Sequence, residues 1–190
     1  FDLYIFFWKR LFYIIFSLLA LIILFPLMLL ISLLIKLFDT GSIIFKQQRV
    51  GINLNLFYIY KFRSMPPNIN NIPSDKIGNL RLSWVSKFIR RTNVDELPQL
   101  FNILKGDMSF VGPRPALPSQ QDLIKLRNKN GVLSFKPGLT GLAQILSYDN
   151  MNMNTKVNFD KKYINSISFK TDLLIILKTF VYLLKTPPVY

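Results

Sequence analysis

Residues 11–35 read LFYIIFSLLALIILFPLMLLISLLI and carry no charged side chain across 25 positions. As a straight helix this stretch would be about 37 Å long, which exceeds the roughly 30 Å hydrocarbon core of a bilayer. It is too long for the apolar part of a signal peptide and lacks a small-residue cleavage site. The stretch therefore predicts a membrane-embedded element over residues 1–40, followed by a separate domain over residues 41–190.

Pro26 lies inside this apolar stretch and influences how the helix meets the membrane. Proline lacks an N–H and clashes with the preceding turn, so it kinks or breaks a helix. Lys9 and Arg10 precede the stretch and Lys36 follows it, and basic residues tend to stay on the cytoplasmic side. The residues alone leave two arrangements open: a re-entrant hairpin with both ends on one face, and a spanning helix with a proline kink.

The remainder of the chain is strongly basic. Residues 41–190 hold 21 Lys and Arg against 8 Asp and Glu, which favours anionic partners such as phosphorylated substrates, anionic lipid or nucleic acid. Cys and His are absent, which excludes disulfides, zinc sites of the usual ligand types and triads that need either residue. Catalysis would therefore depend on carboxylates, cations, hydroxyls or a hard metal ion. Glu96 is the only glutamate.

The pattern of the chain predicts an α+β fold that is mostly helical, with a helical cytoplasmic domain and amphipathic helices in the membrane interface. Two β-rich runs around a Val-Gly-Ile-Asn turn predict a small β-hairpin near 42–62. Helices are expected over residues 83–91, from about 94 to 105, and over 119–130, 155–165 and 172–185. The last is apolar but too short to span, so we expect it in the interface. Loops are expected at 66–80, 111–118 and 136–145.

Asp95 and Glu96 are the main candidates for chemistry. Pro98 is tolerated only in the first turn of a helix, so we expect the helix to start near Val94 or Asp95, with both acids at its positive end. Carboxylate pKa values fall at such an end, and an ionised carboxylate can attack phosphorus while its neighbour holds Mg²⁺. Acids at helix starts are also common as simple caps.

Arginines surround this acidic pair in the sequence. Arg90 precedes Asp95 by five residues, and Arg114 lies between Pro113 and Pro115, which limit the backbone around it. A guanidinium group can bind phosphate through two hydrogen bonds at once. Two acids among arginines, next to a membrane segment, indicate a site for phosphoryl transfer.

Several runs of sequence resemble the signature of the bacterial sugar transferases, the monotopic phosphoglycosyl transferases that begin glycan assembly on undecaprenyl phosphate. The most specific runs are DELPQLFN at 95–102, KGDMS at 105–109 and VGPRP at 111–115. Further matching runs are IFKQQRVG at 44–51, YKFRSM at 60–65 and KPGLTG at 136–141. The resemblance covers nearly the whole chain in the expected order.

The resemblance implies a covalent mechanism. Asp95 would attack the β-phosphate of a UDP-sugar, release UMP and form an aspartyl phosphosugar, while Glu96 would bind Mg²⁺. Polyprenyl phosphate would then accept the phosphosugar at the cytoplasmic face of the bacterial inner membrane. The implied partners are therefore UDP-sugar, polyprenyl phosphate and membrane lipid, and no nucleic acid.

The resemblance also implies a set of residues around the substrate. Arg90 and Arg114 match positions near the bound phosphates, whereas the roles of Lys61, Arg63 and Asp160 are not assigned. The substrate- and phosphate-binding candidates are Arg90, Arg114, Lys61, Arg63, Pro113, Pro115 and Asp160.

The family's membrane element is a re-entrant helix broken at a proline, which favours a hairpin broken at Pro26. Three positions depart from the family pattern: Phe25 stands where Ser is usual, Tyr13 where Asp is common and Leu142 where Trp is frequent. Phe25 removes a hydroxyl that could satisfy a backbone group freed by the proline. None of the three departures touches the acidic pair.

Two other classes of function remain open on the residues alone. A basic, membrane-tethered module could bind nucleic acid or anionic lipid without catalysis, although no helix-turn-helix or RNA-binding motif is present. A structural subunit could use Asp95 and Glu96 only as helix caps. The sequence leaves the sugar, the glycan pathway and the oligomeric state, a homodimer included, undetermined.

Overall fold

The computed structural model describes residues 4–39, 41–65, 83–146 and 151–183. A π-helical turn, η1 (Tyr4–Trp8), leads into the long helix α1 (Lys9–Phe38). With 30 residues, α1 is about 45 Å long. It is apolar and long enough to cross a membrane, and only 11% of its apolar window is buried in the molecule.

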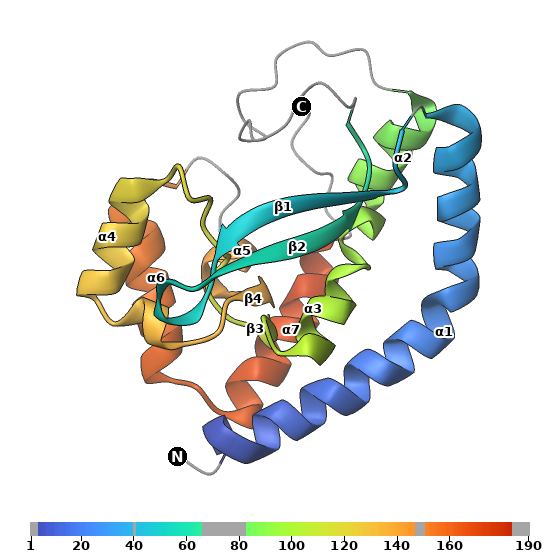
Figure 1. The fold of residues 1–190 in the computed structure, drawn as a ribbon. Coiled ribbons are helices and arrows are strands. Elements are labelled where there is room, and N and C mark those ends of the chain that lie inside the picture. The colour runs from blue at the N-terminus through green and yellow to red at the C-terminus, as the bar shows by residue number, and fades with distance from the viewer. Residues whose placement is uncertain (1–3, 40, 66–82, 147–150, 184–190) are drawn as a thin grey trace.

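Pro26 lies inside α1 without interrupting it. The helix bends instead, so that its last part rises beside α2 (Trp84–Thr92) (Figure 1). Two features favour a bend: Pro26 removes one hydrogen bond of the helix, and the hydroxyl of Ser32 donates to the carbonyl of Met28 at 2.7 Å. The break expected at Pro26 is therefore a change of direction within one helix.

The predicted β-hairpin is confirmed. Strands β1 (Ile44–Val50) and β2 (Leu56–Phe62) pair antiparallel, joined by the 3₁₀ turn η2 (Ile52–Leu54). In this register Phe57 lies opposite Arg49, and Phe45 lies opposite Lys61. Because alternate residues of a strand share a face, Arg49 and Lys61 point to the same side of the hairpin.

The helical part of the fold follows the predicted order. Its further elements are η4 (Val94–Glu96), α3 (Gln99–Lys105), α4 (Gln121–Lys129), η5 (Val132–Ser134), α6 (Met153–Asn165) and α7 (Phe169–Leu183). The predicted start of the third helix near Val94 is wrong: Pro98 occupies the N-cap of α3, and both acids lie on the separate turn η4.

The loop predicted at 136–145 contains regular structure, whereas the loop predicted at 111–118 shares only Val111 with a strand. Strands β3 (Ser109–Val111) and β4 (Gly138–Thr140) pair in parallel, and α5 (Leu142–Leu146) follows β4. A Cβ atom at Gly138 would lie 2.1 Å from the amide nitrogen of Gly112, so only glycine permits this close approach. The loop predicted at 66–80 lies outside the described residues.

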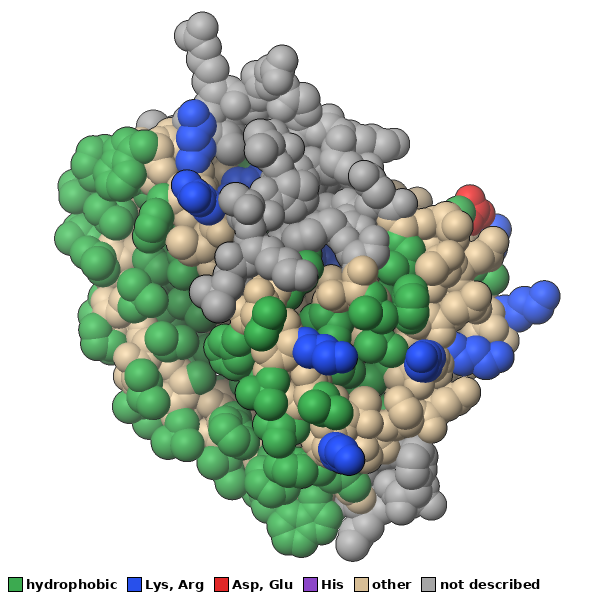
Figure 2. Space-filling view, turned by 180° about the vertical axis from the view of Figure 1, so that it is seen from behind, with side chains coloured by type: hydrophobic (Ala, Val, Ile, Leu, Met, Phe, Trp, Pro, Cys, Tyr) green, Lys and Arg blue, Asp and Glu red, His purple; other side chains and the backbone are tan. Residues whose placement is uncertain are grey.

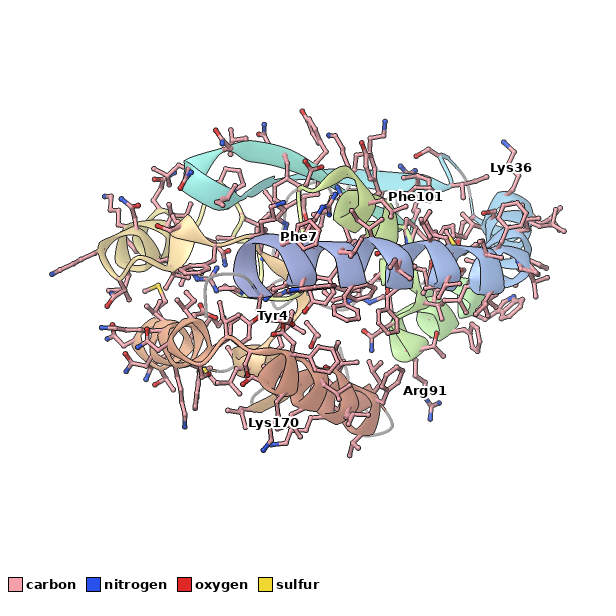
Figure 3. The ribbon with its side chains drawn as sticks, turned by 90° about the horizontal axis from the view of Figure 1, so that it is seen from below. Tyr4, Phe7, Lys36, Arg91, Phe101 and Lys170 are labelled. Atoms are coloured by element: carbon pink, nitrogen blue, oxygen red, sulfur yellow. The ribbon has the colours of Figure 1, made fainter. Side chains whose placement is uncertain are left out.

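One side of α1 packs along the domain. Tyr13 lies in a buried cluster with Ile103, whereas Ile31 and Ile35 lie in another with Ile89 of α2. Phe12 also contacts Phe169 of α7, whose ring centroid is 5.4 Å away, and Figure 3 shows α7 beside α1. The opposite side of α1 is apolar and exposed, as the hydrophobic surface in Figure 2 shows.

A polar network anchors the first turns of α1. Asp172 of α7 is buried, and Lys9 Nζ lies 3.1 Å from its Oδ2. The hydroxyls of Tyr4, Tyr13 and Tyr163 donate to the same carboxylate at 2.8, 2.7 and 2.6 Å. Tyr13, which stands where the family commonly has Asp, therefore contacts a carboxylate that α7 supplies.

Candidate active site

The acidic pair lies where the hairpin, η4 and the loop after β3 meet. Lys61 of β2 places its Nζ 2.5 Å from Oε1 of Glu96 and 3.9 Å from Oδ2 of Asp95. Arg114 reaches the same Oε1 from the loop, with Nη2 at 3.7 Å. Both acids are partly buried. The structure thus assembles two carboxylates and two cations from three separate segments.

Arg90 joins this group from the last turn of α2. Ser83 caps the start of that helix by accepting a hydrogen bond from the amide of Ser86 at 3.0 Å. The helix ends at Asn93, which adopts a left-handed conformation with φ 54° and turns the chain directly into η4. This short connection places the positive charge of Arg90 close enough to lower the pKa of Asp95.

The two carboxyl groups have opposite pKa shifts. Burial raises the pKa of Asp95 to about 6, and Glu96 adds to the rise, although Lys61 and the two arginines oppose it. Burial also acts to raise the pKa of Glu96, but Lys61 and Arg114 lower it to about 2. The predicted fall therefore holds for Glu96 and is wrong for Asp95. At neutral pH Asp95 is ionised but more basic than an ordinary aspartate.

Asn102 connects the strand that carries Lys61 to the helix that follows the acidic pair, and the sequence did not identify it as a site residue. Asn102 belongs to α3, and its side chain is fully buried. The amide of Tyr60 donates to Oδ1 of Asn102 at 3.1 Å, and Nδ2 of Asn102 donates to the carbonyl of Tyr58 at 2.7 Å. These bonds tie β2 to α3. The sequence feature that could have identified Asn102 is an amide side chain placed between the apolar residues Leu100 and Ile103.

Arg49 is a second residue that was missed, although it belongs to one of the matching motifs. It donates to the carbonyl of Pro115 at 3.1 Å and to Oε1 of Gln47 at 2.6 Å. Burial, together with the nearby charge of Arg114, lowers the pKa of Arg49 to about 10, and Arg49 in turn helps to lower the pKa of Glu96. Arg49 follows Gln47 by two residues along β1, so the two side chains lie on the same face of the hairpin. Gln47 is buried, which identifies this face as the inner one.

The loop around Arg114 directs that side chain outward. Pro113 and Pro115 are buried, whereas the side chain of Arg114 is 47% exposed. Buried prolines restrict the backbone on both sides of the arginine. The guanidinium group is thus partly exposed to solvent while it remains near Glu96.

Two predicted site residues have other partners. Arg63 donates to the hydroxyl of Ser42 at 2.7 Å. Asp160 is buried and pairs with Arg127, whose Nη2 lies 2.7 Å from Oδ2 of Asp160. Burial raises the pKa of Asp160 above its ordinary value, although the charge of Arg127 opposes this rise. Neither residue contacts the acidic pair through these bonds.

The donor set limits how a metal ion could bind. Among the described residues, no three acids gather in one place. Mg²⁺ commonly takes one or two carboxylates, with waters and substrate phosphates completing its coordination. Both Lys61 and Arg114 lie near the same oxygen of Glu96, Oε1. Glu96 could therefore hold Mg²⁺ only together with waters or substrate phosphates.

Comparison with known proteins gives a consistent result. A family model described as bacterial sugar transferase matches residues 4–186. The undecaprenyl-phosphate galactose phosphotransferase of Salmonella typhimurium is 37% identical over 97% of the chain, and the UDP-glucose:undecaprenyl-phosphate glucose-1-phosphate transferase of Klebsiella pneumoniae is 39% identical over 90%. The chain spans only 42% and 39% of the length of these two relatives.

A third relative is closer to this chain in length. The exopolysaccharide production protein ExoY of Sinorhizobium fredii is 36% identical over 90% of the chain, and the match covers 83% of that relative. The family match over residues 4–186 includes the long apolar helix, the hairpin and the acidic pair together.

Proposed function

The chain belongs to the bacterial sugar transferase family, and we propose that it moves a sugar 1-phosphate from a UDP-sugar to polyprenyl phosphate as the first membrane step of glycan assembly. The observation that carries this proposal is the pair Asp95 and Glu96, held beside Lys61 and Arg114. Two relatives are named as transferases that act on undecaprenyl phosphate, which supports the same class of acceptor.

In the first step Asp95 is the nucleophile. A carboxylate oxygen of Asp95 forms a bond to the β-phosphorus of the donor, while the bond from that phosphorus to the bridging oxygen breaks and UMP leaves with the electron pair. The raised pKa of Asp95 supports this role, because a more basic carboxylate is a stronger nucleophile and is still ionised at neutral pH.

The cations bind and orient the donor diphosphate. Arg114 is exposed enough to contact a phosphate, and its fork can donate two hydrogen bonds at once. Lys61 holds Glu96 ionised and lies 3.9 Å from Asp95, so it can also balance charge that develops on the phosphoryl oxygens. Mg²⁺, when bound by Glu96 and the diphosphate, would supply further charge neutralisation.

In the second step polyprenyl phosphate accepts the phosphosugar. An oxygen of its phosphate bonds to the same phosphorus, and the acyl phosphate bond to Asp95 breaks, which restores the carboxylate. UMP must leave before this acceptor attacks, so the two half-reactions give ping-pong kinetics.

We place the active site at the cytoplasmic face of the bacterial inner membrane, with α1 as a re-entrant element. Both ends of α1 contact the same domain: Lys9 pairs with Asp172, and Ile31 and Ile35 pack near α2. A helix that crossed the roughly 30 Å hydrocarbon core could not return to that domain at its far end. The exposed apolar side of α1 would face lipid (Figure 2).

A topology measurement tests this placement. The chain has no cysteine, so single cysteines introduced near residue 4 and near residue 40 give clean reporters. Both should be shielded from a membrane-impermeant thiol reagent in intact cells and labelled after lysis. Labelling of only one position in intact cells would show that the helix spans the bilayer.

The reaction itself is tested by nucleotide release. Purified protein is mixed with Mg²⁺, polyprenyl phosphate and each of a panel of UDP-sugars, and UMP is measured. We expect release with one donor or a few related donors, which would also identify the sugar. Release with none of them would favour a basic membrane-tethered module that binds anions without catalysis.

A further inference from the structure

The loop that carries Arg114 is held through its carbonyl oxygens. Proline has no backbone N–H, so a Pro-Arg-Pro turn offers few donors of its own. All four consecutive carbonyls from Pro113 to Ala116 accept hydrogen bonds from other segments. In chain order the donors are the amide of Gly138 at 2.9 Å, Nη1 of Arg127 at 2.6 Å, Nη1 of Arg49 at 3.1 Å and the amide of Val50 at 2.9 Å.

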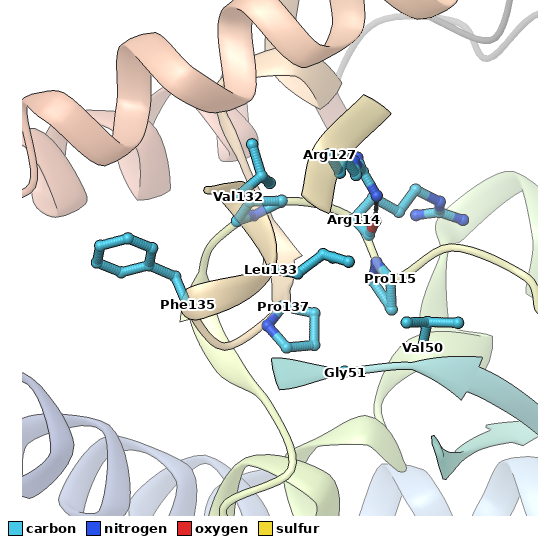
Figure 4. A pocket seen from close by; sticks show the side chains of 10 residues that line it. Val50, Gly51, Arg114, Pro115, Arg127, Val132, Leu133, Phe135 and Pro137 are labelled. Atoms are coloured by element: carbon cyan, nitrogen blue, oxygen red, sulfur yellow. Dashed lines mark hydrogen bonds between the residues drawn. The ribbon is translucent and has the colours of Figure 1, made fainter. Parts of the chain in front are cut away.

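Arg127 is the donor that contacts the carbonyl of Arg114 itself (Figure 4). Its guanidinium makes two further contacts, from Nε at 2.9 Å and Nη2 at 2.7 Å, both to Oδ2 of Asp160. The side chains of Arg127 and Asp160 are each only 2% exposed. A buried guanidinium requires such a partner, because an uncompensated charge in the interior is strongly unfavourable.

The planar shape of the guanidinium makes this arrangement specific. One edge binds the carboxylate of Asp160 while Nη1 binds the carbonyl of Arg114. A lysine at position 127 carries its donors on a single nitrogen and lacks this fixed fork. The family resemblance placed Asp160 among the substrate-binding residues. In the structure Asp160 is instead linked to the Arg114 loop through Arg127.

We propose that the buried Arg127–Asp160 pair positions Arg114 for the phosphoryl transfer. This inference rests on the proposed function, because it assigns α4 and α6 a role in orienting a phosphate-binding arginine of that site. Arg127 and Asp160 touch neither substrate nor reacting atoms. They hold the backbone from which Arg114 reaches to within 3.7 Å of Glu96.

The test replaces the pair as a unit, because removal of one partner would leave a buried charge. Exchange of a buried ion pair for apolar residues of similar volume is often neutral for stability, so the variant is Arg127→Met combined with Asp160→Leu. The control is Lys125→Met, an exposed position on the same helix. We expect the paired variant to retain its thermal unfolding midpoint and to lose about tenfold to 100-fold in kcat/KM for the UDP-sugar.

A double-mutant cycle separates positioning from a general structural role. If the pair acts through Arg114, then adding the paired substitution to Arg114→Gln should cost no more than about a further twofold. Effects that multiply would overturn the proposal, as would full activity of the paired variant. Arg127→Lys with native Asp160 provides a second, charge-conserving variant and should lose most of the same activity.

A second readout does not depend on turnover. Hydrogen exchange at the amides from Val111 to Leu117 should be faster in the paired variant and unchanged in Lys125→Met. Unchanged exchange in the paired variant would overturn the inference. If the wild-type chain releases no UMP from any donor, the proposed function fails, and the exchange measurement still decides whether Arg127 holds the loop.

Discussion

Two pairs of a cation and a carboxylate in this molecule have similar distances and very different surroundings. Lys61 lies 2.5 Å from Glu96, with side chains 16% and 21% exposed. Arg127 lies 2.7 Å from Asp160, with both side chains 2% exposed. The Glu96 oxygen that faces Lys61 is also approached by Arg114, so the first pair is one of several competing contacts. The second pair is closed from solvent.

We propose that burial, more than distance, separates the roles of the two pairs. Charges that are partly exposed and share partners can exchange them for a substrate phosphate at modest cost. A fully buried charge is different, because binding a ligand would require it to leave its partner. That partner would then remain as an uncompensated buried charge. We therefore assign Lys61 and Glu96 to chemistry and Arg127 with Asp160 to positioning.

The largest effect is expected at Asp95. Asp95→Asn removes the nucleophile but keeps the shape of the side chain, so turnover should fall by about 1,000-fold or more with an unchanged unfolding midpoint. The matched control is Asp122→Asn, an exposed acid in the first turn of α4. Comparable UMP release by Asp95→Asn and wild type would remove Asp95 from the mechanism.

Stability should respond most strongly at the buried pair. Asp160→Asn leaves the charge of Arg127 without its partner, so we expect a loss of about 3–5 kcal/mol in the free energy of unfolding. The measurement is denaturant unfolding in detergent. A loss below about 1 kcal/mol would mean that the Arg127–Asp160 pair behaves like an exposed pair.

At Lys61 we expect a smaller effect on stability and a clear effect on activity. Lys61→Met should lower the free energy of unfolding by less than Asp160→Asn does, because Lys61 and Glu96 keep some exposure to solvent, and should reduce kcat/KM by about 10–100-fold, because a charge that faces the transferred group is lost. Steady-state UMP release and unfolding of the same preparation give both numbers. Equal activity of this variant and wild type would contradict a catalytic role for the Lys61–Glu96 pair.

The pH dependence is the smallest and most specific effect. Asp95 must be ionised to attack, and its pKa is raised to about 6. The rate should therefore be constant above that pH and fall about tenfold per unit below it. Lys61 lowers the pKa of Asp95, so Lys61→Met should move this acid limb to higher pH. An acid limb near pH 4 in the wild-type chain would contradict the raised pKa.

The sequence predicted the acidic pair, Arg90, Arg114 and the hairpin because each depends on local pattern or motif. The apolar run also predicted α1, and Ser83 predicted the start of α2, since both signals lie within a few residues. These features needed no knowledge of how distant segments meet.

What the sequence did not predict depends on contacts between distant segments. The pKa of Asp95 is set by burial, which a helix-dipole argument does not include. Nothing in the local pattern distinguishes Arg127 from the other basic residues of α4, and only the fold brings it to Asp160 and to the carbonyl of Arg114. The pairing of β3 with β4 depends on the close approach of Gly112 and Gly138, which are 26 positions apart in the sequence.

The most direct test of the account is a half-reaction without acceptor. Protein mixed with Mg²⁺ and the active UDP-sugar, in the absence of polyprenyl phosphate, should release close to one UMP per active molecule. Its mass should increase by that of the sugar phosphate on a peptide that contains Asp95, and added polyprenyl phosphate should remove the adduct. UMP release that requires the acceptor from the start, with no adduct on Asp95, would contradict the covalent mechanism.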